Sequence, residues 1–473
     1  MLPIAGCQGV GAGSSDLFYP DAGFRGGVVA DEPQAALVGR DVLEAGGAAA
    51  DAMAAMGLAL AVTYPHAVGL GGGGSCVAYD NPKKATVAYD FRPGSPKGGG
   101  AVAVPGLARG LALLQARHGI LEWPQATLPA EKLARNGFVA SRAMVRPLSD
   151  VGPLLRGAPE LSGTIGGTGG VPTEGANLDA LPLAATLGQL RTRGPGDLYQ
   201  GQTAQNFIDA ANRAGGRLSL DDLRAYRVSE GSARLIDHGN HVLVLPSAPT
   251  PGVAAFAELF KATADQAMAE PGVRAKALAS ASRDAYAGAP GTVAGRDDGS
   301  TAAVAVDSGG SAVACTFTMG APLGAGRASR ELGMIFAAAR GNGGRHMVPA
   351  LVVNLNSRSV YWAGAAAADD SAPVALMQTW LDSMGTNAAD LQQAIAAPRL
   401  IDAGGGIVHE PGTSAEALAG LSSLGERMTE AGPLGRVAAV WCPKGMAGSL
   451  QSCRFASDPR GFGLATPARK KGD

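Results

Sequence analysis

The sequence predicts a layered α+β fold. Helical and strand patterns alternate along its 473 residues, and the clearest strand pair is an antiparallel hairpin. In this hairpin the apolar run 302–306 leads through Asp307-Ser308-Gly309-Gly310 into a second apolar run, 312–318. Asp and Gly-Gly tolerate the positive φ of a tight turn. A chain that mixes helices with an antiparallel pair favours segregated layers over a doubly wound parallel sheet.

The individual elements follow from periodicity and turn residues. Strands are predicted near 76–80, 85–91, 302–306, 312–318, 350–354 and 436–442. Helices are predicted near 48–60, 202–214, 220–226, 253–285, 373–383 and 388–397, and in pieces over 104–146 that break at Trp123-Pro124. A glycine-rich run at 69–75 follows the first helix, and the Gly-, Thr-, Pro- and Ser-rich stretch 157–178 is predicted to be a loop.

Composition and charge exclude several classes of protein. The apolar fraction is 46% and charged residues make up 17%, which argues against intrinsic disorder. The net charge is −1, so no basic surplus exists to neutralise phosphates, and no nucleic-acid partner is expected. No apolar run reaches the length of a membrane helix, so no transmembrane segment is predicted. The six histidines form no ligand cluster, so neither a metal nor another cofactor is expected.

Three of the five cysteines suggest a role. Cys442 and Cys453 flank Pro443, Gly445 and Gly448, and a turn between them would place them opposite each other as a disulfide. The alternative is two small buried apolar residues. Near the N-terminus, Ile4-Ala5-Gly6-Cys7 resembles the segment that precedes a lipidated cysteine in bacterial lipoproteins, although the charged and apolar parts of a leader are missing. Cys7 is therefore a candidate for lipidation, and a periplasmic or envelope location is favoured over a cytoplasmic one.

Several short motifs occur in one order along the chain. They are Gly46-Gly47-Ala48-Ala49-Ala50-Asp51-Ala52, Pro65 with Gly69 to Gly73, Asp90-Phe91-Arg92, Val104-Pro105-Gly106, Gly216 to Tyr226, Ala397-Pro398-Arg399 and Ser457-Asp458-Pro459-Arg460. In this order the chain resembles the γ-glutamyltranspeptidases, which are N-terminal nucleophile hydrolases. The resemblance implies a four-layer αββα sandwich with the 302–318 hairpin central in one sheet. It also implies an N-terminal extension, residues 1–26, a large-subunit-like region, 27–299, and a small-subunit-like region, 300–473, that together form one compact domain.

The resemblance also implies a nucleophile. In the family the precursor cleaves itself and frees an N-terminal Thr, and Ser300 falls on that position, with Thr301 next to it. A hydroxyl on an N-terminal residue has its own α-amine as general base. Thr318 matches a supporting Thr that would hydrogen-bond the nucleophile's oxygen. An ordinary turn into a strand after Asp297-Asp298-Gly299 is the competing interpretation of this segment.

The family's substrate-binding positions are only partly kept. Arg92 matches the arginine that holds a substrate carboxylate, a role that suits a planar guanidinium, but a surface ion pair is equally compatible with it. Asn342 replaces an acidic residue that binds the substrate's amino group, and Arg345 and His346 replace paired serines. Ala367 and Ala368 replace the glycines of the oxyanion hole, a change that fails sterically if φ is positive. The loop between Gly333 and Met347 is shorter than the family's, so its substrate lid is expected to be absent.

Two functions are compatible with these observations. The first is a divergent amidohydrolase or acyltransferase that acts on a small-molecule or peptide amide through an acyl-enzyme. The second is an inactive relative that binds a protein partner in the cell envelope. Retention of hydroxyl residues at both 300 and 318 favours the enzyme.

Overall fold

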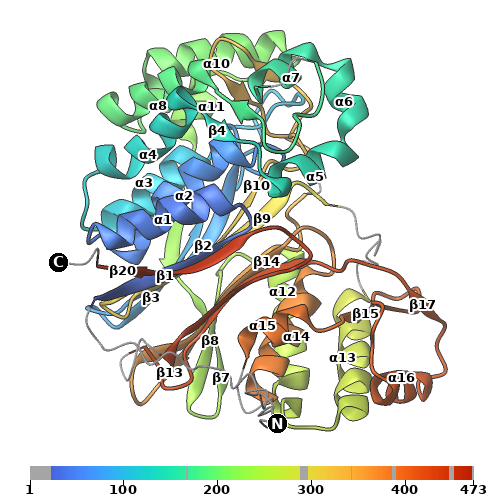
Figure 1. Ribbon diagram of the computed structural model, residues 1–473. Coiled ribbons are helices and arrows are strands. Elements are labelled where there is room, and N and C mark those ends of the chain that lie inside the picture. The colour runs from blue at the N-terminus through green and yellow to red at the C-terminus, as the bar shows by residue number, and fades with distance from the viewer. Residues whose placement is uncertain are drawn as a thin grey trace, which may run out of the picture.

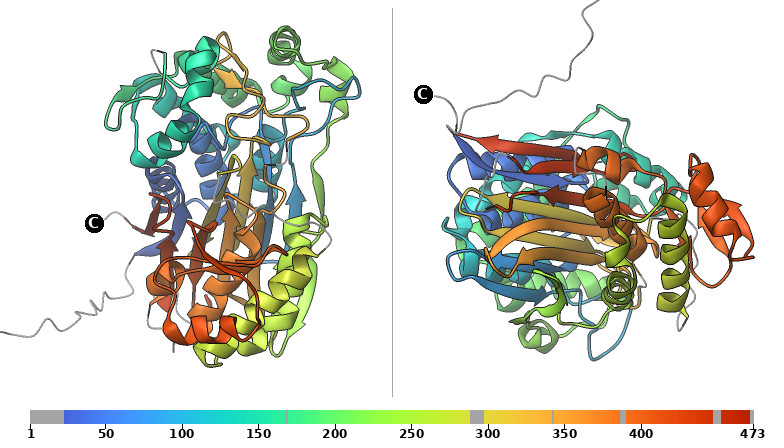
Figure 2. Two further views of the ribbon diagram at one scale, coloured as in Figure 1. Left: turned by 90° about the vertical axis from the view of Figure 1, so that its right-hand side faces the viewer. Right: turned by 90° about the horizontal axis from the view of Figure 1, so that it is seen from below.

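The computed structural model describes residues 23–166, 169–287, 297–341, 343–385, 390–446 and 452–470. In this part of the chain two antiparallel sheets lie face to face, and helices cover the outer face of each (Figures 1 and 2). These four layers are the αββα sandwich that the resemblance implied, so the predicted fold is confirmed.

The first sheet has seven strands. Their order is β20 (Leu464–Arg469), β1 (Phe24–Ala30), β9 (Ser300–Asp307), β10 (Ala312–Thr318), β2 (Gly73–Asp80), β3 (Ala85–Asp90) and β6 (Ser229–Ser232). The predicted hairpin is β9–β10, and it lies in the middle of this sheet. Strands from both sides of position 300 therefore pair with one another in one sheet.

The second sheet has six strands. Their order is β19 (Arg454–Ser457), β18 (Arg436–Trp441), β14 (Ser359–Ala367), β13 (Val348–Asn354), β8 (His241–Leu245) and β7 (Arg234–His238). Shorter strands lie outside the two main sheets: β4 (Phe138–Val139), β5 (Asn177–Leu178), β11 (Ala328–Ser329), β12 (Met334–Ile335), β15 (Leu400–Asp402), β16 (Ile407–His409) and β17 (Met428–Glu430).

The helices divide between the two outer layers and their extensions (Figure 1). On the side of the first sheet are α1 (Pro33–Glu44), α2 (Ala49–Thr63), α3 (Leu107–His118), α4 (Trp123–Asn136), α5 (Arg142–Asp150), α6 (Gly152–Gly157), α7 (Pro159–Thr164), α8 (Leu181–Arg193), α9 (Asp197–Gln200), α10 (Gln202–Arg213) and α11 (Leu220–Ala225). On the side of the second sheet are α12 (Pro251–Thr263), α13 (Pro271–Tyr286), α14 (Ala372–Gly385), α15 (Leu391–Ala396) and α16 (Ala415–Ser422).

Strand β9 shows how the core forms between these layers. Side chains alternate along a strand, so its even and odd residues face opposite sides of the sheet. Ala302, Val304 and Val306 belong to the apolar core between the two sheets. Ala303 and Ala305 belong to the core beneath the helical layer, which includes α2. Helix α2 is buried along its whole length, in keeping with a sequence that is apolar except for Asp51 and Thr63.

Two predicted elements differ from the structure. The stretch 157–178 is not a continuous loop, because α7 forms over Pro159–Thr164 and β5 over Asn177–Leu178. The single helix predicted over 253–285 is two helices, α12 and α13, and α13 starts at Pro271, where proline suits the first turn. Local composition does not reveal the short helix in the first segment or the break between helices in the second. Tertiary packing determines both. Among the described residues, no helix combines the length and hydrophobicity needed to cross a bilayer.

Candidate active site

Ser300 is the first residue of β9 and is fully buried. Its Oγ donates a hydrogen bond to Oδ1 of Asp298 and accepts one from the backbone N–H of Ala368, 3.0 Å away. Ala368 directly follows β14 of the second sheet. The Ser300 hydroxyl therefore lies between a carboxylate and a backbone donor, at the edge of the space between the sheets.

Thr301 points to the other side of the first sheet. Its Oγ1 donates to Oδ2 of Asp31, 2.7 Å away, in the segment that joins β1 to α1. This difference follows from the alternation of side chains along β9. Of the two candidate nucleophiles, only Ser300 has its hydroxyl beside Ala368 and the carboxylate that precedes the strand.

The carboxylate of Asp298 is fixed in place. Its Oδ2 accepts from the N–H of Gly344 at 2.7 Å, and its own N–H donates to the carbonyl of Ala368 at 2.7 Å. Burial raises the pKa of Asp298 to about 6, against the lowering effect of the hydrogen bonds from Ser300 and Gly344. Nearby negative charge on Asp297 and Asp369 raises this pKa further.

The peptide bond before Ser300 is polarised by two donors. The carbonyl oxygen of Gly299 accepts from Oγ1 of Thr318 at 3.1 Å and from the N–H of Met319 at 3.2 Å. Gly299 has a φ of +74°, a conformation that glycine adopts without steric cost. Thr318 was expected to hydrogen-bond the oxygen of Ser300. The Thr318 hydroxyl instead donates to the Gly299 carbonyl, and its oxygen accepts from Gly320 N–H at 2.8 Å.

Buried charged side chains contact the residues at the start of β9. Arg436 of β18 pairs with Asp297 at 2.8 Å and with Asp31 at 3.4 Å, and it donates to the Ser300 carbonyl at 3.3 Å. His66 Nε2 lies 3.2 Å from Asp297. Arg436, followed by His66, holds the pKa of Asp297 well below its usual value despite burial, so Asp297 is ionised and occupied by these partners.

Two of the predicted substrate-binding residues, Arg92 and His346, each lie against an aspartate. Arg92 forms an ion pair with Asp90, its own near neighbour, with 2.6 Å between Nη2 and Oδ2. His346 is buried, with Nδ1 2.6 Å from Oδ1 of Asp370, and Arg345 is exposed. The structure therefore fits the alternative ion-pair interpretation of Arg92.

Two predicted positions cannot be placed, because Asn342 and Cys7 lie outside the described residues. Ala367 is the last residue of β14 and pairs with Arg436 in the sheet. Ala368 has a φ of +94°, the conformation in which the replacement of glycine by alanine was expected to be strained. It nevertheless presents its N–H to Ser300.

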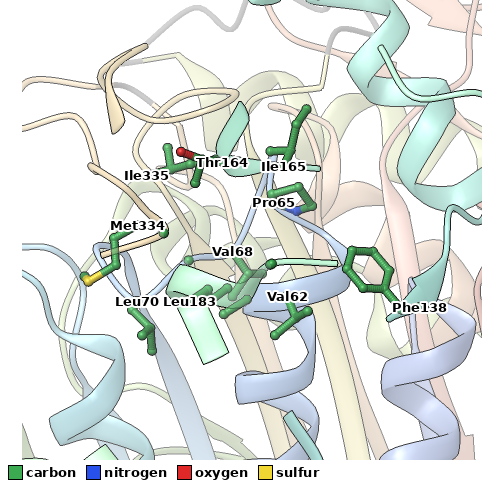
Figure 3. Close-up of a pocket in the computed structure, with 14 residues that line it drawn as sticks. Val62, Pro65, Val68, Leu70, Phe138, Thr164, Ile165, Leu183, Met334 and Ile335 are labelled. Atoms are coloured by element: carbon green, nitrogen blue, oxygen red, sulfur yellow. The ribbon is translucent and has the colours of Figure 1, made fainter. Parts of the chain in front are cut away.

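A hollow of about 180 Å³ opens beside this group. Its lining includes Asp297, Ala368 and Arg436 from the site, together with Tyr64, Arg146 and Phe462. A second space lies among mostly apolar side chains from separate segments, which include Val62, Leu183 and Ile335 (Figure 3). This second space measures only about 10 Å³, the room of a single water, so it is a packing seam and not a substrate site.

Several residues of the site were not predicted from the sequence. Asp298 was noted only as part of a turn, although a carboxylate two residues before a candidate nucleophile is a usable signal. Asp31 and Arg436 come from distant segments and carry no local signal.

The cysteines form two disulfides in the structure. Cys442 is joined to Cys453, the pair predicted from the turn between them. Cys76 of β2 is joined to Cys315 of β10, a pair that the sequence did not predict, and these two residues lie directly opposite each other in the sheet. In the described part of the chain no cluster of three His, Cys, Asp or Glu side chains has the arrangement of a metal site.

Comparison with known proteins agrees with this architecture. The sequence profile described as gamma-glutamyltranspeptidase matches residues 35–288, more than half of the chain. Glutathione hydrolase 2 of Arabidopsis thaliana is 33% identical over 220 residues, which cover 43% of this chain and 38% of that protein. The glutathione hydrolase proenzyme of Escherichia coli (strain K12) is 30% identical over 261 residues, covering 50% and 45% of the two chains.

The chain thus spans less than half the length of these curated relatives, and the profile match ends before Ser300. A likeness over the whole fold comes from a solved structure. The cephalosporin acylase from Bacillus halodurans superposes with a TM-score of 0.76 at 17% identity, covering 97% of this chain and 99% of that one.

Proposed function

Because the chain belongs to the gamma-glutamyltranspeptidase family, we propose that it is an amidohydrolase or acyltransferase whose nucleophile is Ser300, freed by cleavage of the bond to Gly299. One observation carries this proposal. The Ser300 hydroxyl is held by Asp298 and the Ala368 N–H, while the carbonyl of the bond to be cut accepts two hydrogen bonds. An ordinary turn into a strand requires none of these contacts.

The chemistry after cleavage follows from the same contacts. The new α-amine of Ser300 acts as the general base for its own hydroxyl, which attacks the amide carbonyl of the substrate. The C–N bond of the amide then breaks as the α-amine passes the proton to the leaving nitrogen, and an acyl-enzyme remains. The N–H of Ala368, now 3.0 Å from Oγ, is placed to donate to the oxyanion that develops next to that oxygen. One such donor typically contributes about 10²–10³ in rate. Water or an amine then takes the acyl group.

The substrate we propose differs from a γ-glutamyl compound. The guanidinium of Arg92 already binds the Asp90 carboxylate through Nε and Nη2, so one bidentate edge of the guanidinium is occupied. The hollow beside Ala368 instead offers Tyr64 and Phe462 as apolar walls. Arg146 lines the same hollow, is exposed and has no ion pair among the described residues. Asp150 and Asp369 line the hollow as well, so its lining carries charges of both signs. These features support an amide whose acyl group has an apolar body and a polar end.

The compartment is part of the proposal. Two disulfides support an oxidising environment, since such bonds rarely persist in a reducing cytosol. We therefore propose the periplasm or the cell envelope. We also propose that Cys7 carries a lipid, which mass spectrometry of the N-terminal peptide would detect.

The deciding experiment is electrophoresis of the purified, denatured protein with a reducing agent, followed by N-terminal sequencing. We expect two fragments, the smaller of which begins at Ser300. Ser300→Ala should remain uncut. Thr301→Val, the matched control, should still be cut, because the Thr301 hydroxyl is directed to Asp31 and not to the scissile bond.

The opposite results are equally informative. A wild-type chain that stays intact for days would refute the enzyme and support the inactive, partner-binding alternative. Cleavage that persists in Ser300→Ala and stops in Thr301→Val would transfer the nucleophile to Thr301.

A further inference from the structure

Asp298, whose carboxylate contacts the Ser300 hydroxyl, precedes the Gly299–Ser300 bond. Cleavage of this bond would therefore place Asp298 and Ser300 on different fragments. We propose that Asp298 is the general base that starts the cleavage of the Gly299–Ser300 bond, and that it serves this step alone. This inference rests on the proposed function, since it assigns the base for the self-cleavage described above. In this proposal Asp298 is the base for self-cleavage of the precursor, and the α-amine of Ser300 is the base for substrate turnover in the mature protein.

The geometry selects Asp298 among the nearby acidic groups. Its Oδ1 accepts directly from Ser300 Oγ, and the Gly344 N–H at 2.7 Å from Oδ2 keeps the carboxylate in that orientation. Asp297 is turned toward Arg436 and His66. Asp31 is occupied by Thr301, on the other face of the sheet. Among the described residues, Asp298 is the carboxylate that contacts the nucleophile.

The reaction balances without any co-reactant except water. The Ser300 hydroxyl passes its proton to Asp298 as Oγ forms a bond to the carbonyl carbon of Gly299. Thr318 and the Met319 N–H stabilise the negative charge on the Gly299 oxygen. The C–N bond then breaks as Asp298 returns the proton to the Ser300 nitrogen, which leaves an ester. Water hydrolyses this ester into the Gly299 carboxylate and the free hydroxyl of Ser300.

Asp298 remains on the fragment that ends at Gly299. It is then no longer joined through the chain to Ser300, whose free α-amine takes over as the base. The base for cleavage and the base for turnover are thus different groups, and they can be tested separately.

The charged surroundings give the cleavage a defined pH dependence. The charged groups that act on Asp298 are Asp297 in the same segment and Asp369 after β14. Arg436 of β18 pairs with Asp297. Burial and the two carboxylates place the pKa of Asp298 at about 6, so it is mostly ionised and able to accept a proton at pH 7. We expect the cleavage rate to fall as the pH drops through about 6.

The test follows the full chain from its synthesis. Radiolabelled protein made by cell-free translation is moved into buffers from pH 5 to 8, and cleavage is followed on reducing gels. Asp298→Asn should slow cleavage at pH 7.5 by at least about 100-fold, the lower range for loss of a general base. It should also lose the rise in rate with pH, and Asp298→Glu should restore part of both.

The matched control is Asp307→Asn. Asp307 is also buried, lies at the far end of the same strand, and accepts backbone hydrogen bonds from Ala49 and Ser311. This variant should cleave at the wild-type rate. Thermal melting of each variant in a Ser300→Ala background separates loss of the base from loss of the fold.

Three results would overturn the assignment, and they are distinguishable. Cleavage of Asp298→Asn within about threefold of wild type, with the same pH profile, removes Asp298 from the step while the proposed function stands. If Asp298→Asn fails to fold, a wild-type rate that does not change between pH 5 and 8 has the same meaning. A wild-type chain that never cleaves refutes both this inference and the proposed function.

Discussion

Ala368 is held in a backbone conformation that an alanine rarely adopts. Its φ is +94°, and its N–H and carbonyl both bind the segment 298–300 at the start of β9, at Ser300 Oγ and Asp298 N. A non-glycine residue in such a region costs about 1–3 kcal/mol and persists only where its surroundings enforce it. Its two contacts to this segment are what enforce it. The strain therefore lies at the donor nearest the nucleophile.

Ala368→Gly should consequently stabilise the folded protein. Relief of the strain is opposed by the greater flexibility of glycine in the unfolded chain, which leaves a net gain of about 1 kcal/mol. The measurement is urea unfolding in a Ser300→Ala background, where the chain stays in one piece. This background removes the contact with Ser300 Oγ and keeps the bond from Asp298 N–H to the Ala368 carbonyl. Ala366→Gly, a buried strand position of ordinary φ, is the control and should lose about 1 kcal/mol or more. An Ala368→Gly protein that is less stable than its parent would show that the conformation is not strained.

At the scale of elements, β18 contributes the charge that holds the two sheets together around the site. Arg436 extends from the second sheet to Asp31 and Asp297, which flank strands β1 and β9 of the first sheet. Its side chain is only 12% exposed. Removing one partner of such a buried group leaves the other charges without compensation, which is costlier than losing a surface pair.

Arg436→Met should therefore lower the free energy of unfolding by about 3–5 kcal/mol. Arg213→Met, which breaks the exposed pair with Glu331, should cost less than about 1 kcal/mol. Both are measured by urea unfolding at pH 7. Equal effects of the two substitutions would contradict the role given to Arg436.

The effect of acid on this cluster has a definite sign. Arg436 and His66 lower the pKa of Asp297 from its usual value of 3.8, so its stabilising contribution is present above that value and lost as the pH falls through the depressed pKa. In Arg436→Met this pKa should rise, because a neutral side chain replaces the main opposing charge. The difference in free energy of unfolding between wild type and Arg436→Met should accordingly become smaller as the pH is lowered below about 4.

At the scale of the whole molecule, the layers could be predicted from the sequence and the site only in part. The hairpin of β9 and β10 was found because its apolar runs and its turn are adjacent in the chain, and the order of short motifs pointed to four layers. Ser300 and Asp298 are also close together in the chain, so their proximity can be read from the sequence. The contacts of Ala368 and Arg436 with Ser300 depend on how one sheet packs over the other, and they join residues 68 and 136 positions apart. No local pattern encodes such contacts.

The bond between Cys76 and Cys315 gives the proposed cleavage an unusual product. Cys76 precedes Gly299 and Cys315 follows it, so the disulfide would join the two fragments as a covalent heterodimer. The bond between Cys442 and Cys453 lies wholly after the cut and links nothing new. Without a reducing agent, a fully cleaved wild-type protein should migrate as one chain even when denatured, and a Cys76→Ser, Cys315→Ser double variant should separate into two. If the wild-type fragments part in the absence of reductant, the bond has not formed. If they stay together, hydrolysis of the peptide bond frees the amine of Ser300 without freeing the subunit that carries it.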